Sequence, residues 1–150
     1  MRTLGLDVGT KTIGVAVSDG LGLTAQAITT IRRTNLKADL AALAELAREH
    51  EASRIVVGLP LNMDGTEGPR AEASRRFADA ASQALGLPVE FWDERLSTVA
   101  AERTLLEADL TRARRRQVID QVAAQFILQG WLDARRPAEE LHADDFDLES

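Results

Sequence analysis

The first 31 residues contain three strand-like segments joined by very short connections, which leaves few folds open. Residues 3–9 and 13–19 are rich in apolar and β-branched side chains, and only the turn GTKT separates their cores. Residues 25–31 form a third, weaker segment after Gly20 and Gly22. Connections this short join neighbouring antiparallel strands, so we expect the chain to begin with an antiparallel meander.

The remainder of the chain alternates helices with strands. In residues 35–50, four leucines recur at helical spacing behind Asn35, a plausible N-cap. Strands are expected at residues 53–60 and 89–92, and further helices at about 70–85, 97–108 and 111–134. The order β-β-β-α-β-α-β-α-α combines the meander with right-handed parallel crossovers. The sequence therefore predicts an α/β fold: a mixed five-stranded sheet with a central first strand and helices on both faces.

The excess of acidic over basic residues lies at the end of the chain. The formal net charge is -6, with 18 basic and 24 acidic residues. Six of those acids and no Lys or Arg lie in residues 137–150, so residues 1–136 carry 24 − 6 = 18 acids against 18 bases. We expect one domain over residues 1–136 and a flexible acidic tail over residues 137–150. The overall charge therefore does not exclude a nucleic-acid partner.

Two absences bear on the cellular setting. The chain has no cysteine, so it can form neither disulfides nor thiolate metal sites. No signal peptide and no apolar run of transmembrane length is recognisable. We expect a cytoplasmic protein that does not bind membranes.

Asp7 is a carboxylate within the first apolar strand. Side chains alternate along a strand, so Asp7 shares its face with Gly5 and Gly9. Glycine within a strand often marks the close approach of a ligand or another backbone. An unpaired buried charge is costly, and a divalent cation would offset that cost. The alternative interpretation is that Asp7 caps the turn or pairs with Lys11.

Two further acidic positions are candidates for the same site. Asp93 and Glu94 stand where the fifth predicted strand ends, which is where ligands gather in open α/β sheets. The alternative interpretation is that they mark the start of a helix, with Ser97 as its N-cap. Asp120 lies in the last predicted helix, at the border of its apolar face, where an acid can equally be solvated.

Basic residues accompany these acids. Arg112, Arg114, Arg115 and Arg116 stand at the entry to the helix that carries Asp120. Such a cluster beside carboxylates is consistent with phosphate contacts. Pairing with acids of the preceding segment, at Glu102, Glu107 or Asp109, explains the cluster equally well.

Four segments together resemble the YqgF/RuvX family: LDVGTKTIGVAVSD, VVGLPLNMDGTEGP, DERLSTVAAERTLLEA and RRRQVIDQVAAQFILQGWLD. They span nearly the whole chain except the acidic tail. The family is similar to the RuvC Holliday-junction resolvases and implies a ribonuclease H-like fold. It also implies a nuclease, described either for the 5′ end of the 16S ribosomal RNA precursor or for Holliday junctions.

The resemblance assigns roles to single residues. By motif, Asp7, Glu94 and Asp120 match the catalytic, metal-binding acids of the family. Asp93 is the alternative to Glu94 as the second of these acids. The implied cofactor is Mg²⁺ or Mn²⁺, expected as two ions in a phosphodiester hydrolysis. Lys11, Arg95 and the four arginines of residues 112–116 would then contact the phosphate backbone. The implied partner is RNA or branched DNA, bound by a monomer or a homodimer.

Two other functions are compatible with parts of the sequence. The segment DVGTKTIGVAV also looks like the phosphate-binding turn of the actin and sugar-kinase group, but those proteins need two such domains. A module that binds structured RNA or a ribosome precursor without cutting it would need only the arginine cluster. Cleavage assays with and without Mn²⁺ separate the nuclease from this binding module.

Overall fold

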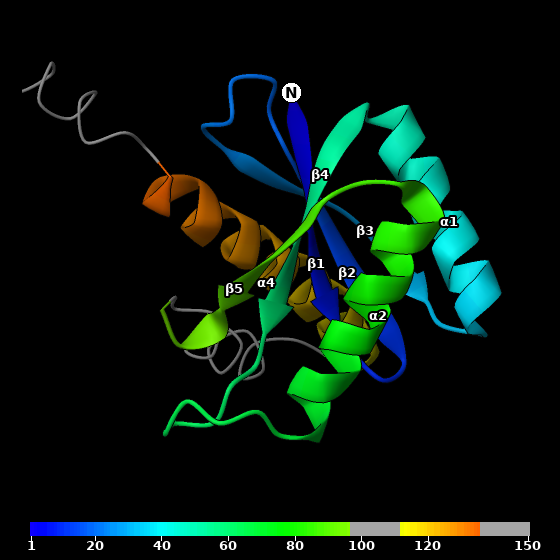
Figure 1. Cartoon of the computed structure of the whole chain (residues 1–150). Helices are drawn as coiled ribbons and strands as arrows, with labels where there is room; N and C mark the ends of the chain where they lie inside the picture. Colours follow the sequence, from blue (N-terminus) through cyan, green and yellow to red (C-terminus); the bar gives the residue numbers. More distant parts are fainter. Residues whose placement is uncertain (97–111, 136–150) are drawn as a thin grey trace, which may run out of the picture.

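The computed structural model describes residues 1–96 and 112–135, and for residues 112–118 and 120 it describes the backbone alone (Figure 1). The strands are β1 (Arg2–Val8), β2 (Thr12–Ser18), β3 (Ala25–Arg32), β4 (Ala52–Leu59) and β5 (Val89–Asp93). The helices are α1 (Leu36–Glu49), α2 (Pro69–Leu85), the short 3₁₀ helix η1 (Glu94–Leu96) and α4 (Arg112–Ala134). The helix predicted over residues 97–108 and the tail lie outside the described residues.

The five strands form one mixed sheet in the order β3-β2-β1-β4-β5. The pairs β1–β2 and β2–β3 are antiparallel, whereas β1–β4 and β4–β5 are parallel. This topology confirms the predicted meander followed by crossovers, and it places β1 at the centre. A central strand has neighbours on both edges, so any polar side chain it carries lies deep in the molecule.

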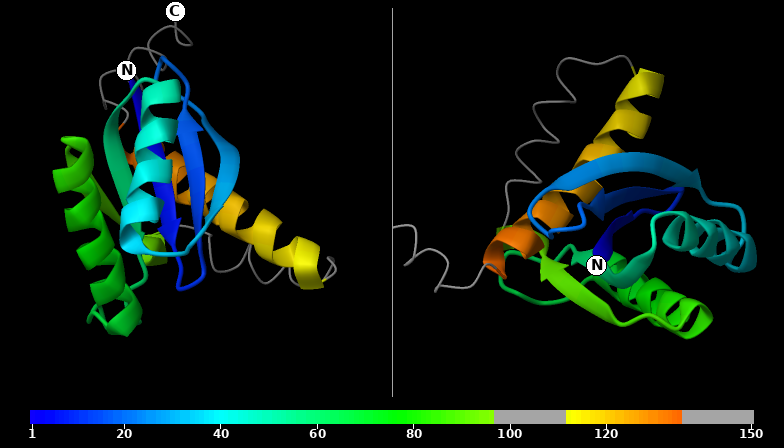
Figure 2. Two further views of the ribbon diagram at one scale, coloured as in Figure 1. Left: turned by 90° about the vertical axis from the view of Figure 1, so that its right-hand side faces the viewer. Right: turned by 90° about the horizontal axis from the view of Figure 1, so that it is seen from above.

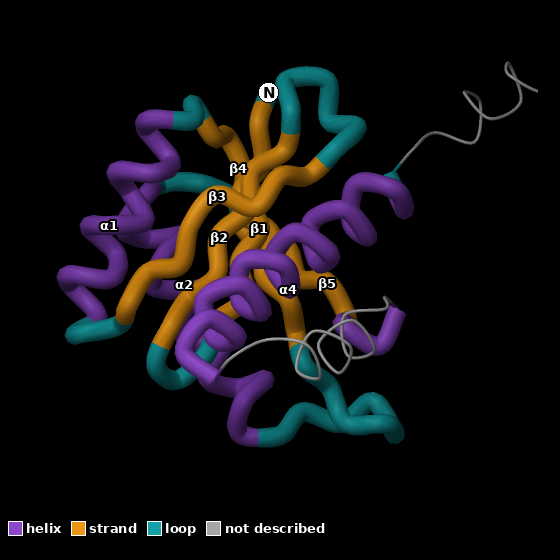
Figure 3. Tube along the Cα trace, turned by 180° about the vertical axis from the view of Figure 1, so that it is seen from behind, coloured by secondary structure: helices purple, strands orange, loops and turns teal. Residues whose placement is uncertain are grey.

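Helices cover both faces of the sheet, as predicted. Figure 2 shows α1 and α2 on one side of the strands and α4 crossing the other, and Figure 3 shows α4 running over the back of β1 and β2. The first core joins Leu4, Leu6 and Val8 of β1 to Leu43 and Phe77 from the two helices. The opposite core is built on α4, with Ile127, Leu128 and Trp131 against Ala16 and Val56. Thus odd-numbered residues of β1 face α4.

The ends of the helices follow the local sequence. The Asn35 side chain accepts a 2.9 Å hydrogen bond from the Ala38 amide and so caps α1, as predicted. The α2 helix ends at Gly86, whose φ of 68° is in the left-handed region that glycine adopts at little cost. Leu36, expected in the apolar stripe of α1, is half exposed, and the buried contact centres on Leu43. None of the described helices is long and apolar enough to cross a membrane.

Gly5 marks the place where α4 packs directly on β1. A Cβ atom at this position would lie 2.6 Å from Leu128 Cβ and 3.1 Å from the backbone oxygen of Ala124. Of the two explanations for a glycine in this strand, a ligand or another backbone, the structure shows the second at Gly5, because α4 fills the space that a ligand would need. Gly9 is required by the turn that follows β1, since a Cβ there would lie 2.9 Å from the backbone oxygen of Thr12.

Substituting Gly5 by Ala should destabilise the protein by about 1–3 kcal/mol, the usual cost of overpacking a core. The clash involves a helix backbone atom and a Cβ, neither of which can move by a change of rotamer. Gly20→Ala is the matched control, because a Cβ at Gly20 has no neighbour within 4 Å. Equilibrium urea unfolding of the three proteins measures the difference. Equal midpoints for Gly5→Ala and Gly20→Ala would contradict this packing.

Candidate active site

Asp7 is a buried carboxylate on the central strand. It is 6% exposed and lies near the carboxyl end of β1, on the face covered by α4. Its antiparallel neighbour is Gly14 of β2. On the other side, Leu6 pairs with Val57, so the next residue of β4, Gly58, follows beside Asp7 on the same face. Asp7 therefore lies between two strands that carry no side chain at the adjacent positions.

Glu94 reaches the same face from the end of β5. A Cβ atom at Gly58 would lie 3.4 Å from Glu94 Oε1, and 2.4 Å from Cδ1 of Ile127 on α4. Glu94 Oε1 is itself buried. Because Gly58 has no side chain, the Glu94 carboxylate can lie under α4 above β4, the strand next to β1, which carries Asp7. Two acids 87 residues apart in sequence, at positions 7 and 94, lie under the same helix.

Asp93 has a different environment. Arg95 donates to both of its carboxylate oxygens, with Nη2 2.8 Å from Oδ2 and Nε 3.1 Å from Oδ1, and the Arg95 amide lies 2.9 Å from Oδ1. The hydrogen bonds from the Arg95 side chain lower the pKa of Asp93, and the same pairing raises the pKa of Arg95. Asp93 pairs in register with Leu59 and lies on the face opposite Trp92. Of the two adjacent acids, Glu94 is the one under α4.

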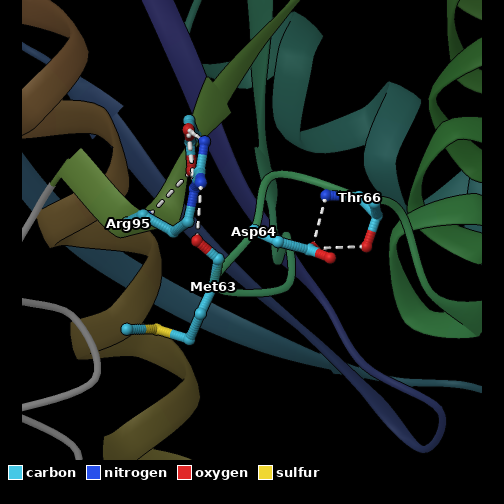
Figure 4. Close-up of polar contacts among 5 residues, drawn as sticks. Met63, Asp64, Thr66 and Arg95 are labelled. Carbon is cyan, nitrogen blue, oxygen red and sulfur yellow. Dashed lines mark hydrogen bonds and ion pairs between the residues drawn. The ribbon is translucent and has the colours of Figure 1, made fainter.

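The loop between β4 and α2 is tied to this 3₁₀ turn (Figure 4). Arg95 Nη1 donates to the Met63 carbonyl oxygen at 3.2 Å. Inside the loop, Asp64 Oδ1 accepts from the Thr66 hydroxyl at 2.6 Å and from the Thr66 amide at 3.0 Å, which lowers the pKa of Asp64. The Arg95 guanidinium, which the sequence assigned to phosphate contacts, is thus bonded to Asp93 and to this loop.

Acid should release this connection. Because the pKa of folded Asp93 is below its ordinary value of 3.8, the pair stabilises the fold above about pH 3.8 and loses its effect as pH falls through the lowered pKa. Arg95→Gln should therefore unfold at lower urea concentration than wild type at pH 7, and the difference should narrow as pH falls below 3.8, leaving only the part that comes from the hydrogen bond to Met63. Arg70→Gln, an exposed substitution on α2, is the control. A gap between Arg95→Gln and wild type that is as large at pH 2 as at pH 7 would contradict this assignment.

An ion pair between Arg33 and the buried Asp39 holds the turn that follows Asp7, and no pattern in the sequence predicts it. Asp39 of α1 is 2% exposed and accepts from Arg33 Nε at 3.2 Å and from the Thr34 amide at 3.1 Å. Arg33 Nη1 in turn donates to the Gly9 carbonyl oxygen at 2.8 Å. The pair anchors the β1–β2 turn, on which Lys11 is exposed to solvent.

Asp120 and the four arginines are placed only through the backbone of α4. Ala124, Ile127 and Trp131 follow position 120 at one, two and three turns, and all three are buried. Position 120 therefore lies on the sheet-facing side of the helix, rather than at the border of its apolar face as predicted. The residues Arg112, Arg114, Arg115 and Arg116 occupy the first two turns of α4. The side chains of these five residues lie outside the described set.

The donors present suit a hard divalent cation. Carboxylate oxygens are the ligands that Mg²⁺ and Mn²⁺ prefer, and the Glu94 Oε1 atom is buried in the space that a Cβ at Gly58 would approach. Among the side chains that the structure describes, no three acids or histidines lie close enough to form a metal cluster. A third ligand would have to come from outside that set, and position 120 is on the correct side of α4 to supply it.

A family model and two similar sequences point to the same family. A family model described as "RuvX: Holliday junction resolvase" matches residues 1–134. A protein of Myxococcus xanthus is 77% identical over 150 residues, covering 99% of both chains. A protein of Moorella thermoacetica is 68% identical over 133 residues, covering 89% of this chain and 95% of its own. Both carry the name "Putative pre-16S rRNA nuclease".

Comparison with solved structures supports the same fold. RuvC of Thermus thermophilus, in complex with a Holliday junction substrate, superimposes with a TM-score of 0.55 at 15% identity and covers 90% of this chain and 95% of its own. The Fowlpox virus resolvase, in complex with Holliday junction DNA, gives a TM-score of 0.55 at 10% identity and covers 89% and 98%. The architecture is the ribonuclease H-like fold of these resolvases, as predicted.

Proposed function

The chain belongs to the RuvX family of nucleases, and from this premise we propose that it cleaves the precursor of 16S ribosomal RNA near its 5′ end. The substrate follows the names of its relatives, which are 77% and 68% identical to it. Processing of a ribosomal precursor is a cytoplasmic activity in a bacterium. We assign the catalytic unit to residues 1–136, and the family match over residues 1–134 supports this assignment.

The burial of Asp7 is the observation that supports this proposal most. This carboxylate is 6% exposed, near the carboxyl end of the central strand, and the neighbouring positions on β2 and β4 are glycines, so it is well placed to bind a cation. Glu94 lies under the same helix, and α4 supplies a sheet-facing position at Asp120. Such a set of acids supports a divalent metal-dependent hydrolysis.

We expect the acids to bind the metal and the basic residues to position the nucleic acid. Asp7, Glu94 and Asp120 would hold the divalent metal, Mg²⁺ or Mn²⁺, whose chemistry is to activate water and to neutralise charge on the leaving oxygen. The cover of α4 keeps bulk water away from Asp7, which strengthens electrostatic interactions there. Lys11, exposed on the turn after Asp7, and the arginines at the start of α4 would position the phosphate backbone.

Branched DNA is the second candidate substrate. The family description and the fold of RuvC favour it. Cutting a four-way junction symmetrically requires two active sites, so a dimer in solution would support the junction and a monomer would support RNA. The oligomeric state, measured by sedimentation, is therefore part of the test.

The deciding experiment compares three labelled substrates under identical conditions: 16S rRNA precursor, unrelated single-stranded RNA and a four-way DNA junction. We expect cleavage of the precursor with Mg²⁺ or Mn²⁺ and none after chelation. Cleavage of the junction alone would replace the proposed substrate. Salt-sensitive binding of the precursor without any cleavage would favour the non-cutting binding module and overturn the proposal.

A further inference from the structure

A pocket lies at the end of the molecule opposite the acids. It has a volume of about 250 Å³ and is lined by Met1 and Thr3 of the N-terminal end of β1, by the loop around Leu21 and by the end of α4. Thr3 and Asp7 are four residues apart on one strand, about 13 Å at 3.3 Å per residue. The pocket is thus separate from the candidate active site.

The lining combines exposed apolar groups with cations. Met1 and Leu21 are 89% and 82% exposed, and Trp131 and Leu132 also line the pocket. The charged groups of the lining are the amino terminus of Met1 and the side chains of Arg54 and Arg135, with no acid among them. The pocket therefore suits a ligand that is both apolar and anionic.

Trp131 is the central aromatic group of this pocket. The Cζ atoms of Arg54 and Arg135 lie 5.4 and 4.5 Å from the centroid of its ring. Glu90 Oε2 approaches both arginines, at 3.5 Å from Arg54 Nε and 3.4 Å from Arg135 Nη1. Because Arg54 and Arg135 share one carboxylate, both guanidinium groups can donate hydrogen bonds to further anionic partners.

The chain itself carries a segment of matching chemistry. Residues 137–150 contain six acids and no Lys or Arg, together with Leu141, Phe146 and Leu148. The segment begins two residues after Arg135, which lines the pocket. An unstructured connection of 11 residues spans about 18 Å on average, so Phe146 can return to a pocket built around Arg135.

We propose that the acidic C-terminal segment, residues 137–150, binds this pocket, with the Phe146 ring in its apolar part and the neighbouring acids facing Arg54 and Arg135. A cavity of about 150 Å³ accepts benzene, so 250 Å³ is sufficient for a phenyl ring. A short tether provides an effective concentration in the millimolar range, so even weak contacts fill the pocket. The segment lies beyond the family match, which ends at residue 134. This binding does not depend on the proposed nuclease activity.

The test uses the full chain, whose lack of cysteine allows a single spin label at Ser150→Cys. The chain has two tryptophans, so its ¹H–¹⁵N spectrum has two indole signals, which Trp92→Phe assigns. We expect the label to broaden the Trp131 indole and the Leu21 amide far more than the Lys11 amide. Phe146→Ala in the labelled chain should weaken this binding about tenfold or more and relieve the broadening, because it removes a buried aromatic group. His142→Ala is the control within the segment and should leave the broadening unchanged.

Three results would overturn the proposal. The first is equal broadening throughout the described surface, or broadening that Phe146→Ala does not change. The second is selective broadening at Lys11, which would place the segment at the opposite end. The third is broadening of an unlabelled ¹⁵N chain by labelled ¹⁴N chains, which would make a second copy the occupant.

Discussion

Asp7→Asn should reduce the rate of phosphodiester cleavage by about 1000-fold or more. Asn keeps the shape of the side chain but loses its charge and one strong oxygen donor for a cation. Metal-assisted stabilisation of the transition state is worth several kcal/mol, and each factor of ten in rate corresponds to about 1.4 kcal/mol. The loss should appear in the chemical step, measured under single-turnover conditions with saturating protein.

The matched control for this substitution is Asp79→Asn. Asp79 is exposed on α2, on the opposite side of the sheet from α4. The Asp79→Asn variant should cleave at the wild-type rate. The affinities of both variants for the substrate, measured by gel shift, should stay close to the wild-type affinity. Thermal unfolding checks that Asp7→Asn is folded. Cleavage by folded Asp7→Asn at the wild-type rate would remove Asp7 from the site.

Much of the fold was predictable because local patterns and topology agree. The β-branched runs of residues 13–19 and 53–60 and the leucines of residues 35–50 have the periods of buried strands and of an amphipathic helix. Short connections require antiparallel neighbours, and helical crossovers require parallel ones. These rules fix the position of the first strand at the centre of the sheet, and with it the burial of Asp7.

Close approach between distant elements could not be predicted in the same way. Gly5 was compatible with the close approach of a ligand or of another backbone, and the structure places α4, more than 100 residues later in the sequence, in that space. The ion pair of Arg33 with Asp39 was missed because Asp39 reads as an ordinary polar residue on an amphipathic helix. Arg95 looked like a phosphate ligand, yet its geometry is set by the Asp93 carboxylate and a loop carbonyl. The Gly5 contact and the Arg95 hydrogen bond to the loop carbonyl are tertiary contacts. The pairs Arg33–Asp39 and Asp93–Arg95 are instead short-range side-chain contacts. The period of apolar residues encodes neither kind.

The choice between two adjacent acids shows how the structure extends the sequence. Motif matching favours Glu94 only weakly over Asp93, because both follow the same strand. Alternation of side chains along β5 places Asp93, its last residue, on the face opposite Trp92, and there Arg95 pairs with the Asp93 carboxylate. Glu94 Oε1 instead lies in the space left by Gly58, under Ile127 of α4. The adjacent carboxylates thus have different environments, one under α4 and one in the attachment of a loop.

Glu94→Gln should therefore lower single-turnover cleavage by about 100-fold or more, as expected when a metal-binding carboxylate loses its charge. Asp93→Asn should stay within about tenfold of wild type, because Asp93 acts through Arg95 and the loop around Met63 rather than on the substrate. The two substitutions are matched in chemistry and adjacent in sequence, so each is the control for the other. Raising the Mn²⁺ concentration should restore part of the activity of Glu94→Gln and leave Asp93→Asn unchanged. The reverse order of rates would assign the metal to Asp93 and the structural role to Glu94.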